Sequence, residues 1–306
     1  MKTAIKNKYV FTALLLILLA AAGIGLTELY VRFERGAEPE SGFHVVTSFY
    51  PVYIAAENII GDVGGVSLAN LSEPQTGCLH DYQLTTEDMR KLSAADVFLI
   101  NGGGMEHFLS EVAGRYPSLT VVNASEQIDL LADNAHAWMS IPDYMVQVQT
   151  IADGLSALDE AHRKEYEANC GRYMQQLKQL LKKQQAVREQ IPQSVPRRSV
   201  LFHEAFAYLA RDFGLQAAGS LDLDEERQVS AGEVAQVVRL VKEQAVPFIL
   251  AEEQYGKQMC ETVQKEADVQ AVYLDPCVQG DGRADSYVRA MRENIRVLQE
   301  AFAKLK

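Results

Sequence analysis

Histidines and an aspartate stand where ligands commonly gather in α/β proteins. His203 and Asp275 each directly follow a short apolar run, and His80 and His136 lie between a predicted strand and a predicted helix. In open parallel sheets, ligands bind beyond the carboxyl ends of the strands. Imidazoles with one carboxylate are ligands that suit a tetrahedral Zn2+ site. The carboxylate also lowers the net positive charge of the site. These positions therefore predict a metal site made by His80, His136, His203 and Asp275.

Each of these residues also has an ordinary structural interpretation. A loop histidine is usually a hydrogen-bonding surface residue, and an aspartate before Pro276 is typical of a turn after a strand. No HExxH or CxxC unit is present to support a metal site by spacing alone. The shared position between strand and helix distinguishes the predicted ligands from His44, His107 and His162, which we expect to bind no metal.

A long helix is predicted to connect two α/β lobes. Asp159 can cap its start, Pro192 ends it, and at 1.5 Å per residue it would be about 45 Å long. Its apolar stripe has helical spacing and comprises Tyr166, Cys170, Tyr173, Leu177, Leu180, Val187 and Ile191. On either side, short β-branched runs alternate with amphipathic segments. This alternation is typical of parallel sheets with helices on both faces.

The expected organisation has five parts. They are a leader at 1–29, a tether at 30–42, a first lobe at 43–157, the linking helix at 158–192 and a second lobe at 193–306. A length of 306 residues with 48% hydrophobic content suits two domains, each with its own core. The glycines at 102–104 lack both GxGxxG spacing and a P-loop lysine, so we expect tight packing or close backbone approach there.

The N-terminus predicts export. Lys2, Lys6 and Lys8 precede an uncharged stretch, residues 9–27, which as a helix would be about 28 Å long and could span a bilayer. The basic residues stay on the inner side, so the rest of the chain is exported. The leader is either a cleaved signal peptide or a retained anchor. The first cysteine is Cys78, so no cysteine near the leader can carry a lipid.

The remaining polar candidates are carboxylates and thiols. Glu204 and Cys78 lie beside predicted ligands, and Glu252 follows another predicted strand, so all three are candidates for the surroundings of the site. The 4 cysteines of an exported chain suggest a disulfide, and Cys260 with Cys277 is the favoured pair because both fall in the second lobe. The alternatives are a bridge from Cys78 to Cys277 and a thiolate ligand.

The order of several short motifs resembles the zinc and manganese solute-binding proteins of ABC importers. The motifs are Gly-Cys-Leu-His-Asp-Tyr at 77–82, Asn-Gly-Gly-Gly-Met-Glu at 101–106, Asn-Ala-His-Ala-Trp at 134–138, Phe-His-Glu-Ala-Phe at 202–206 and Leu-Asp-Pro at 274–276. The resemblance implies two Rossmann-like (β/α)4 lobes, a single rigid connecting helix and a metal site in the cleft between the lobes. It implies that His80, His136, His203 and Asp275 are the ligands.

The resemblance also implies a function. We expect a monomeric, non-enzymatic protein that captures Zn2+, with Mn2+ as the alternative, and delivers it to an ABC permease. We expect it at the outer face of the membrane, in the periplasm or at the cell surface. Manganese-type members tend to have a carboxylate where this chain has His203, which favours zinc. The adjacent Glu204 is the competing ligand at that position.

Other functions remain open from the sequence. A zinc hydrolase could use Glu204 or Glu252 as its base, but it would need an open coordination position and a substrate pocket. A binder of haem, siderophore or cobalamin could share the two-lobe plan, with aromatic or arginine clusters at the site. A surface adhesin would need no metal. The net charge of -12 argues against a nucleic-acid partner.

Overall fold

The computed structural model describes Gly23 and residues 42–72, 82–221, 223 and 229–305. The chain divides into two compact units, Met1–Gly42 and Phe43–Lys306. The predicted leader and tether lie outside the described residues except for Gly23 and Gly42. Among the helices that the structure describes, none is both long enough and apolar enough to cross a membrane.

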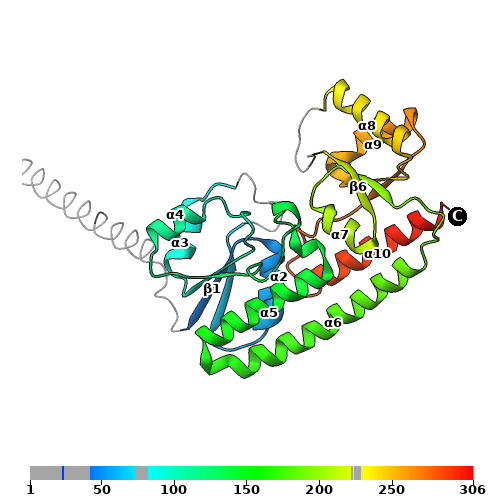
Figure 1. Cartoon of the computed structure of the whole chain (residues 1–306). Helices are drawn as coiled ribbons and strands as arrows, with labels where there is room; N and C mark the ends of the chain where they lie inside the picture. Colours follow the sequence, from blue (N-terminus) through cyan, green and yellow to red (C-terminus); the bar gives the residue numbers. More distant parts are fainter. Residues whose placement is uncertain (1–22, 24–41, 73–81, 222, 224–228, 306) are drawn as a thin grey trace, which may run out of the picture. The chain divides into compact units, whose positions relative to one another are not determined.

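The first lobe contains a parallel sheet with the strand order β2-β1-β3-β4. Its strands are β1 (Phe43–Thr47), β2 (Val66–Asn70), β3 (Val97–Ile100) and β4 (Thr120–Asn123). The helices of this lobe are α2 (Tyr50–Ile60), α3 (Thr86–Ser93), α4 (Leu109–Arg115) and α5 (Ile141–Leu158) (Figure 1). Two short 3-10 turns, η1 (Leu131–Asp133) and η2 (Ala137–Met139), precede α5.

The second lobe repeats this plan with the strand order β6-β5-β7-β8. Its strands are β5 (Arg198–Leu201), β6 (Gln216–Ser220), β7 (Phe248–Ala251) and β8 (Gln270–Tyr273). Its helices are α7 (Phe206–Phe213), α8 (Ala231–Gln244), α9 (Glu253–Glu266) and α10 (Ser286–Ala303). The predicted α/β class with two parallel-sheet lobes is confirmed. In both sheets the central strands are the most buried, as their continuous apolar runs require.

Helix α6 (Arg163–Glu189) connects the lobes and runs beside α5 (Figure 1). Its 27 residues correspond to about 40 Å. Every member of the predicted apolar stripe is buried. Asp159 does not cap α6 as expected, because the 3-10 turn η3 (Glu160–His162) lies between them. Its carboxylate accepts a hydrogen bond from the Tyr166 hydroxyl instead, at 2.8 Å.

Local sequence signals place several helix starts correctly. Thr85 with Asp88 and Ser230 with Glu233 form capping boxes at the starts of α3 and α8. In each pair the side chain of one residue bonds the backbone N–H of the other, which satisfies donors that the first helical turn leaves exposed. These starts depend on residues three apart, so the sequence alone determines them.

The hydrophobic core continues from one lobe into the other. A single cluster includes Val46 and Phe98 of the first sheet, Leu177 of α6 and Phe248 of the second sheet. Helix α10 contributes at both ends. Ser286, at its start, lies 2.8 Å from the Tyr50 hydroxyl, and Phe302, near its end, packs edge-on against the ring of Phe248. The two sheets are therefore joined by packing as well as by α6.

The glycine turn after β3 shows the close backbone approach that we expected. Gly102 has a φ of +81°, and a Cβ built there would lie 1.8 Å from Oδ1 of Asn123. Gly104 has a similar φ of +86°, but a Cβ there would meet nothing within 4 Å. Gly102 is thus constrained by both conformation and space, whereas Gly104 is constrained by conformation alone.

We predict that Gly102→Ala destabilises the protein more than Gly104→Ala. Both changes force alanine into the left-handed region, at about 1–2 kcal/mol each. Gly102→Ala adds overpacking against Asn123, at about 1–3 kcal/mol more. Urea unfolding of the two full-length variants gives the difference directly. Equal losses in the free energy of unfolding would contradict the close contact at Gly102.

Candidate metal centre

His136 lies in a segment that its own neighbours hold in place. The ring is fully buried, and its Nδ1 atom lies 2.8 Å from Oδ1 of Asn134. The same oxygen accepts the backbone N–H of His136 at 2.9 Å. An imidazole that donates from Nδ1 carries its lone pair on Nε2, the nitrogen that can then bind a metal. Asn134 thus fixes both the ring and its tautomer.

Asn101, directly after β3, holds the segment of His136 by a hydrogen bond. Its side-chain amide donates to the carbonyl of Ala135 at 2.9 Å, and its Oδ1 accepts from Nε2 of Gln147 at 2.8 Å. Its backbone N–H donates to Oε1 of the buried Glu106 at 2.7 Å. Burial raises the pKa of Glu106, and hydrogen bonds from the backbone N–H groups of Asn101 and Gly102 partly oppose the rise. A buried polar network of this kind specifies one backbone position for the residue before His136.

The second lobe also holds this segment. The Tyr208 hydroxyl, on α7, donates to the carbonyl of Asn134 at 2.6 Å and accepts the N–H of Leu131 at 3.1 Å. The side-chain amide of Asn134 donates to the carbonyl of Glu204 at 2.9 Å. The chain around His136 is therefore hydrogen-bonded to residues of both lobes.

His203 comes just after β5 and is 1% exposed. Its Nδ1 lies 2.5 Å from Oε1 of Glu252, the first residue after β7. Because β5 and β7 are neighbouring parallel strands, their carboxyl ends bring these two side chains together. A carboxylate on the far nitrogen of a ligating histidine fixes its tautomer and raises its basicity. The structure thus gives Glu252 a defined partner, His203, that its sequence position alone did not specify.

The structure brings His136 and His203 together. Their ring centroids are 5.0 Å apart and their planes meet at 86°. Glu204 approaches the same place, with Oε1 at 3.5 Å from Nδ1 of His136. Two predicted ligands from different lobes are therefore adjacent, with a carboxylate beside them.

Asp275 follows β8 and is open to solvent. Its Oδ1 accepts the N–H of Cys277 at 2.7 Å, and its backbone forms a pair of hydrogen bonds with the side-chain amide of Asn294, both at 2.8 Å. Although the residue is exposed, its surroundings partly desolvate the carboxyl and raise its pKa, and the Cys277 N–H opposes the rise. The carboxylate is thus held in a fixed turn.

The complete ligand set stays a prediction. His80 and Cys78 lie within residues 73–81, outside the described residues. Among the side chains that the structure does describe, no three of the His, Cys, Asp and Glu type form a group that could hold a metal ion. The observed part of the predicted site is the His136–His203 pair.

The predicted disulfide between Cys260 and Cys277 is wrong, because both are buried free thiols. Cys260 lies on α9 against Tyr273, and burial raises its pKa to about 12. Burial and the nearby Asp275 raise the pKa of Cys277. The alternative of a thiolate ligand stays a prediction. A shared lobe did not bring the two sulfur atoms within bonding distance.

Sequence reasoning missed two side chains in the segment it had singled out. Asn134, which positions the His136 ring, lies two residues before it, and Trp138 lies two residues after it. The indole N–H of Trp138 donates to the carbonyl of Pro276 at 2.8 Å, which reaches the loop that carries Asp275. The Asn-x-His spacing was a usable signal for Asn134. No local signal identifies Pro276 as the partner of Trp138.

Comparison with known proteins gives consistent results. The manganese-binding lipoprotein MntA of Halalkalibacterium halodurans is 28% identical over 296 residues, covering 92% of this chain and 94% of that protein. The zinc-binding protein AdcA of Streptococcus pyogenes is 27% identical over 85% of this chain, which spans only 56% of its length.

Solved structures share the fold. The solute-binding protein FpvC of Pseudomonas aeruginosa, in complex with Mn2+, superposes with a TM-score of 0.78 at 26% identity, covering 87% of this chain and all of that one. The family model described as the periplasmic component A of the zinc-uptake complex matches residues 45–301. A match of this extent, together with the two-lobe fold and the paired histidines, shows that the chain belongs to this family of zinc-uptake components.

Proposed function

We propose that this chain is an extracytoplasmic solute-binding protein that captures Zn2+ and delivers it to an ABC-type membrane permease. The observation that carries the proposal is the pair of buried imidazoles, His136 and His203, with ring centroids 5.0 Å apart. Each has its Nδ1 beside a side-chain oxygen, so Nε2 is the nitrogen suited to the metal. His80 and Asp275 would complete a tetrahedral set.

Zinc is the proposed ion and manganese the alternative. Imidazole suits zinc, whereas manganese favours oxygen-rich sites. The relatives include proteins named for zinc and for manganese, so their names alone do not select the ion. The donor set of this chain favours zinc because His203 is buried against Glu252 and aligned for ligation. Glu204, the competing ligand, is 47% exposed.

The family consists of substrate-binding components, and we further propose that this member catalyses no reaction. Four protein ligands would leave no open coordination position for an attacking water. We also propose that the protein acts as an exported monomer. The lysine-flanked apolar leader would direct it to the outer face of the membrane, where a permease can receive the ion.

We predict that Zn2+ raises the melting temperature of the full-length chain. Ligands from two lobes assemble only in the native state, so a thousandfold excess of free ion over Kd stabilises it by about 4 kcal/mol. His203→Ala should abolish most of this shift. His107→Ala changes an exposed histidine that we do not place in the site, and it should retain the shift. A zinc-independent melting temperature in the unmodified protein would contradict the proposed function.

We also predict that Glu252→Gln weakens Zn2+ binding by about 10–100-fold, since it removes the charge that orients His203 and raises its basicity. The matched control is Glu253→Gln. Glu253 is the next residue along the chain, is exposed, and pairs with Lys257 at 2.7 Å. Chelator-competition titrations measure both affinities. Equal effects of the two substitutions would show that the His203–Glu252 contact does not support binding.

A further inference from the structure

Trp138 bonds directly to the loop that carries Asp275. Its indole N–H donates to the carbonyl of Pro276 at 2.8 Å, although the two residues are 138 positions apart in the sequence. The indole is fully buried. Trp138 lies two residues after His136, and Pro276 directly follows Asp275. One hydrogen bond therefore joins the segments that carry two predicted ligands.

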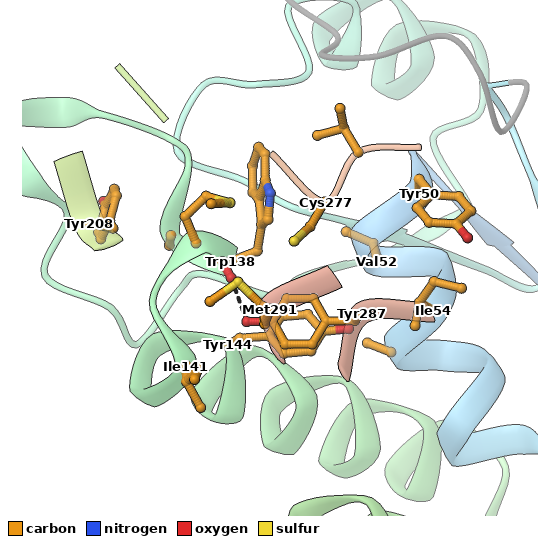
Figure 2. Close-up of a cluster of buried hydrophobic side chains, with 14 of the residues drawn as sticks. Tyr50, Val52, Ile54, Trp138, Ile141, Tyr144, Tyr208, Cys277, Tyr287 and Met291 are labelled. Atoms are coloured by element: carbon orange, nitrogen blue, oxygen red, sulfur yellow. Dashed lines mark hydrogen bonds between the residues drawn. The ribbon is translucent and has the colours of Figure 1, made fainter. Parts of the chain in front are cut away.

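A second hydrogen bond joins Trp138 to α10. The Tyr287 hydroxyl, near the start of α10, donates to the backbone carbonyl of Trp138 at 2.7 Å. The Tyr287 ring stacks on Tyr144 of α5, with centroids 3.8 Å apart (Figure 2). We call the two hydrogen bonds of Trp138, to Pro276 and from Tyr287, the Trp138 bridge.

Packing fixes the direction in which the indole points. Phe49 of the first lobe meets the Trp138 ring edge-on at 5.0 Å between centroids, and the His136 ring lies at the same centroid distance on a tilted plane. Figure 2 shows Trp138 within the buried cluster that also contains Cys277 and the Tyr144–Tyr287 stack. A buried aromatic side chain that is packed on several sides has little freedom to change its orientation.

The Asp275 loop is fixed at its other end as well. The Asn294 side chain holds the backbone of Asp275, and the N–H of Cys277 holds its carboxylate. Within this short turn, the Pro276 carbonyl is the backbone group that Trp138 contacts. The bridge therefore sets where the whole turn lies relative to His136.

We propose that Trp138 is a positioning residue that holds Asp275 in place relative to His136. These two ligands would then already have their binding geometry when the ion arrives. The inference rests on the proposed function. The Trp138 bridge does not position His203, because Glu252 of its own lobe orients that ring. A ligand pair that is held before binding loses less conformational freedom on binding, which increases affinity.

The test uses Trp138→Phe and Tyr287→Phe in the full-length protein, with Zn2+ as the probe. Trp138→Phe removes the indole N–H and keeps an aromatic ring, and Tyr287→Phe removes only the hydroxyl. Each should weaken Zn2+ binding about tenfold in chelator competition, a loss equivalent to one buried hydrogen bond. The matched control is Tyr173→Phe. It removes a hydroxyl from the same aromatic cluster, 3.5 Å from that of Tyr144, and should leave affinity unchanged.

A double-mutant cycle separates positioning from general stability. If Trp138 acts through Asp275, then Trp138→Phe should have little further effect on Zn2+ affinity in an Asp275→Ala background. A purely structural role would give additive losses. Tyr287→Phe changes no ring, so it keeps the test open if Trp138→Phe does not fold.

The outcomes distinguish the two proposals. Zn2+ binding by the unmodified protein with unchanged affinity in both bridge variants would overturn the inference and leave the proposed function standing. Additive losses in the double-mutant cycle would do the same. Failure of the unmodified protein to bind Zn2+ would overturn the proposed function and the inference with it.

Discussion

The proposed metal site depends on the approach of two buried imidazoles, His136 and His203, from opposite lobes. Burying a polar ring is costly unless its nitrogens find partners. Asn134 and Glu252 provide oxygen partners for Nδ1 of each ring. This arrangement is stable as protein structure, and under the proposed function it assigns metal binding to Nε2 of each ring. The same contacts therefore serve folding and the proposed capture of the ion.

The surrounding fold holds the rings of His136 and His203 at a fixed separation. One hydrophobic cluster extends across both sheets, and α6 packs against α2, α5, α7 and α10. Polar contacts add direction to this packing. Tyr208 of the second lobe bonds both ends of η1, and Arg211 of α7 lies 2.8 Å from the Asp143 carboxylate at the start of α5. These contacts tie the segment that carries His136 to packed helices, which hold side chains more precisely than isolated loops do.

The features that could be predicted from the sequence are those that neighbouring residues determine. The apolar stripe of α6 follows from residues a few positions apart, and the structure confirms it. The capping boxes at Thr85 and Ser230 depend on equally local spacing. The strand ends placed His203 correctly, because parallel strands expose their carboxyl ends at one edge. Contacts between distant segments could not be read in this way. The Trp138–Pro276 bond and the separation of Cys260 from Cys277 arise only from tertiary packing.

The most direct test of the central claim is zinc-edge X-ray absorption on the full-length protein loaded with one equivalent of Zn2+. The account predicts a first shell of nitrogen and oxygen only, at about 2.0–2.1 Å, with the outer-shell scattering characteristic of more than one imidazole. A sulfur shell at about 2.3 Å would instead place a cysteine thiolate in the site. That result would contradict the proposed ligand set, and an absence of imidazole scattering would contradict the claim that His136 and His203 bind the ion together.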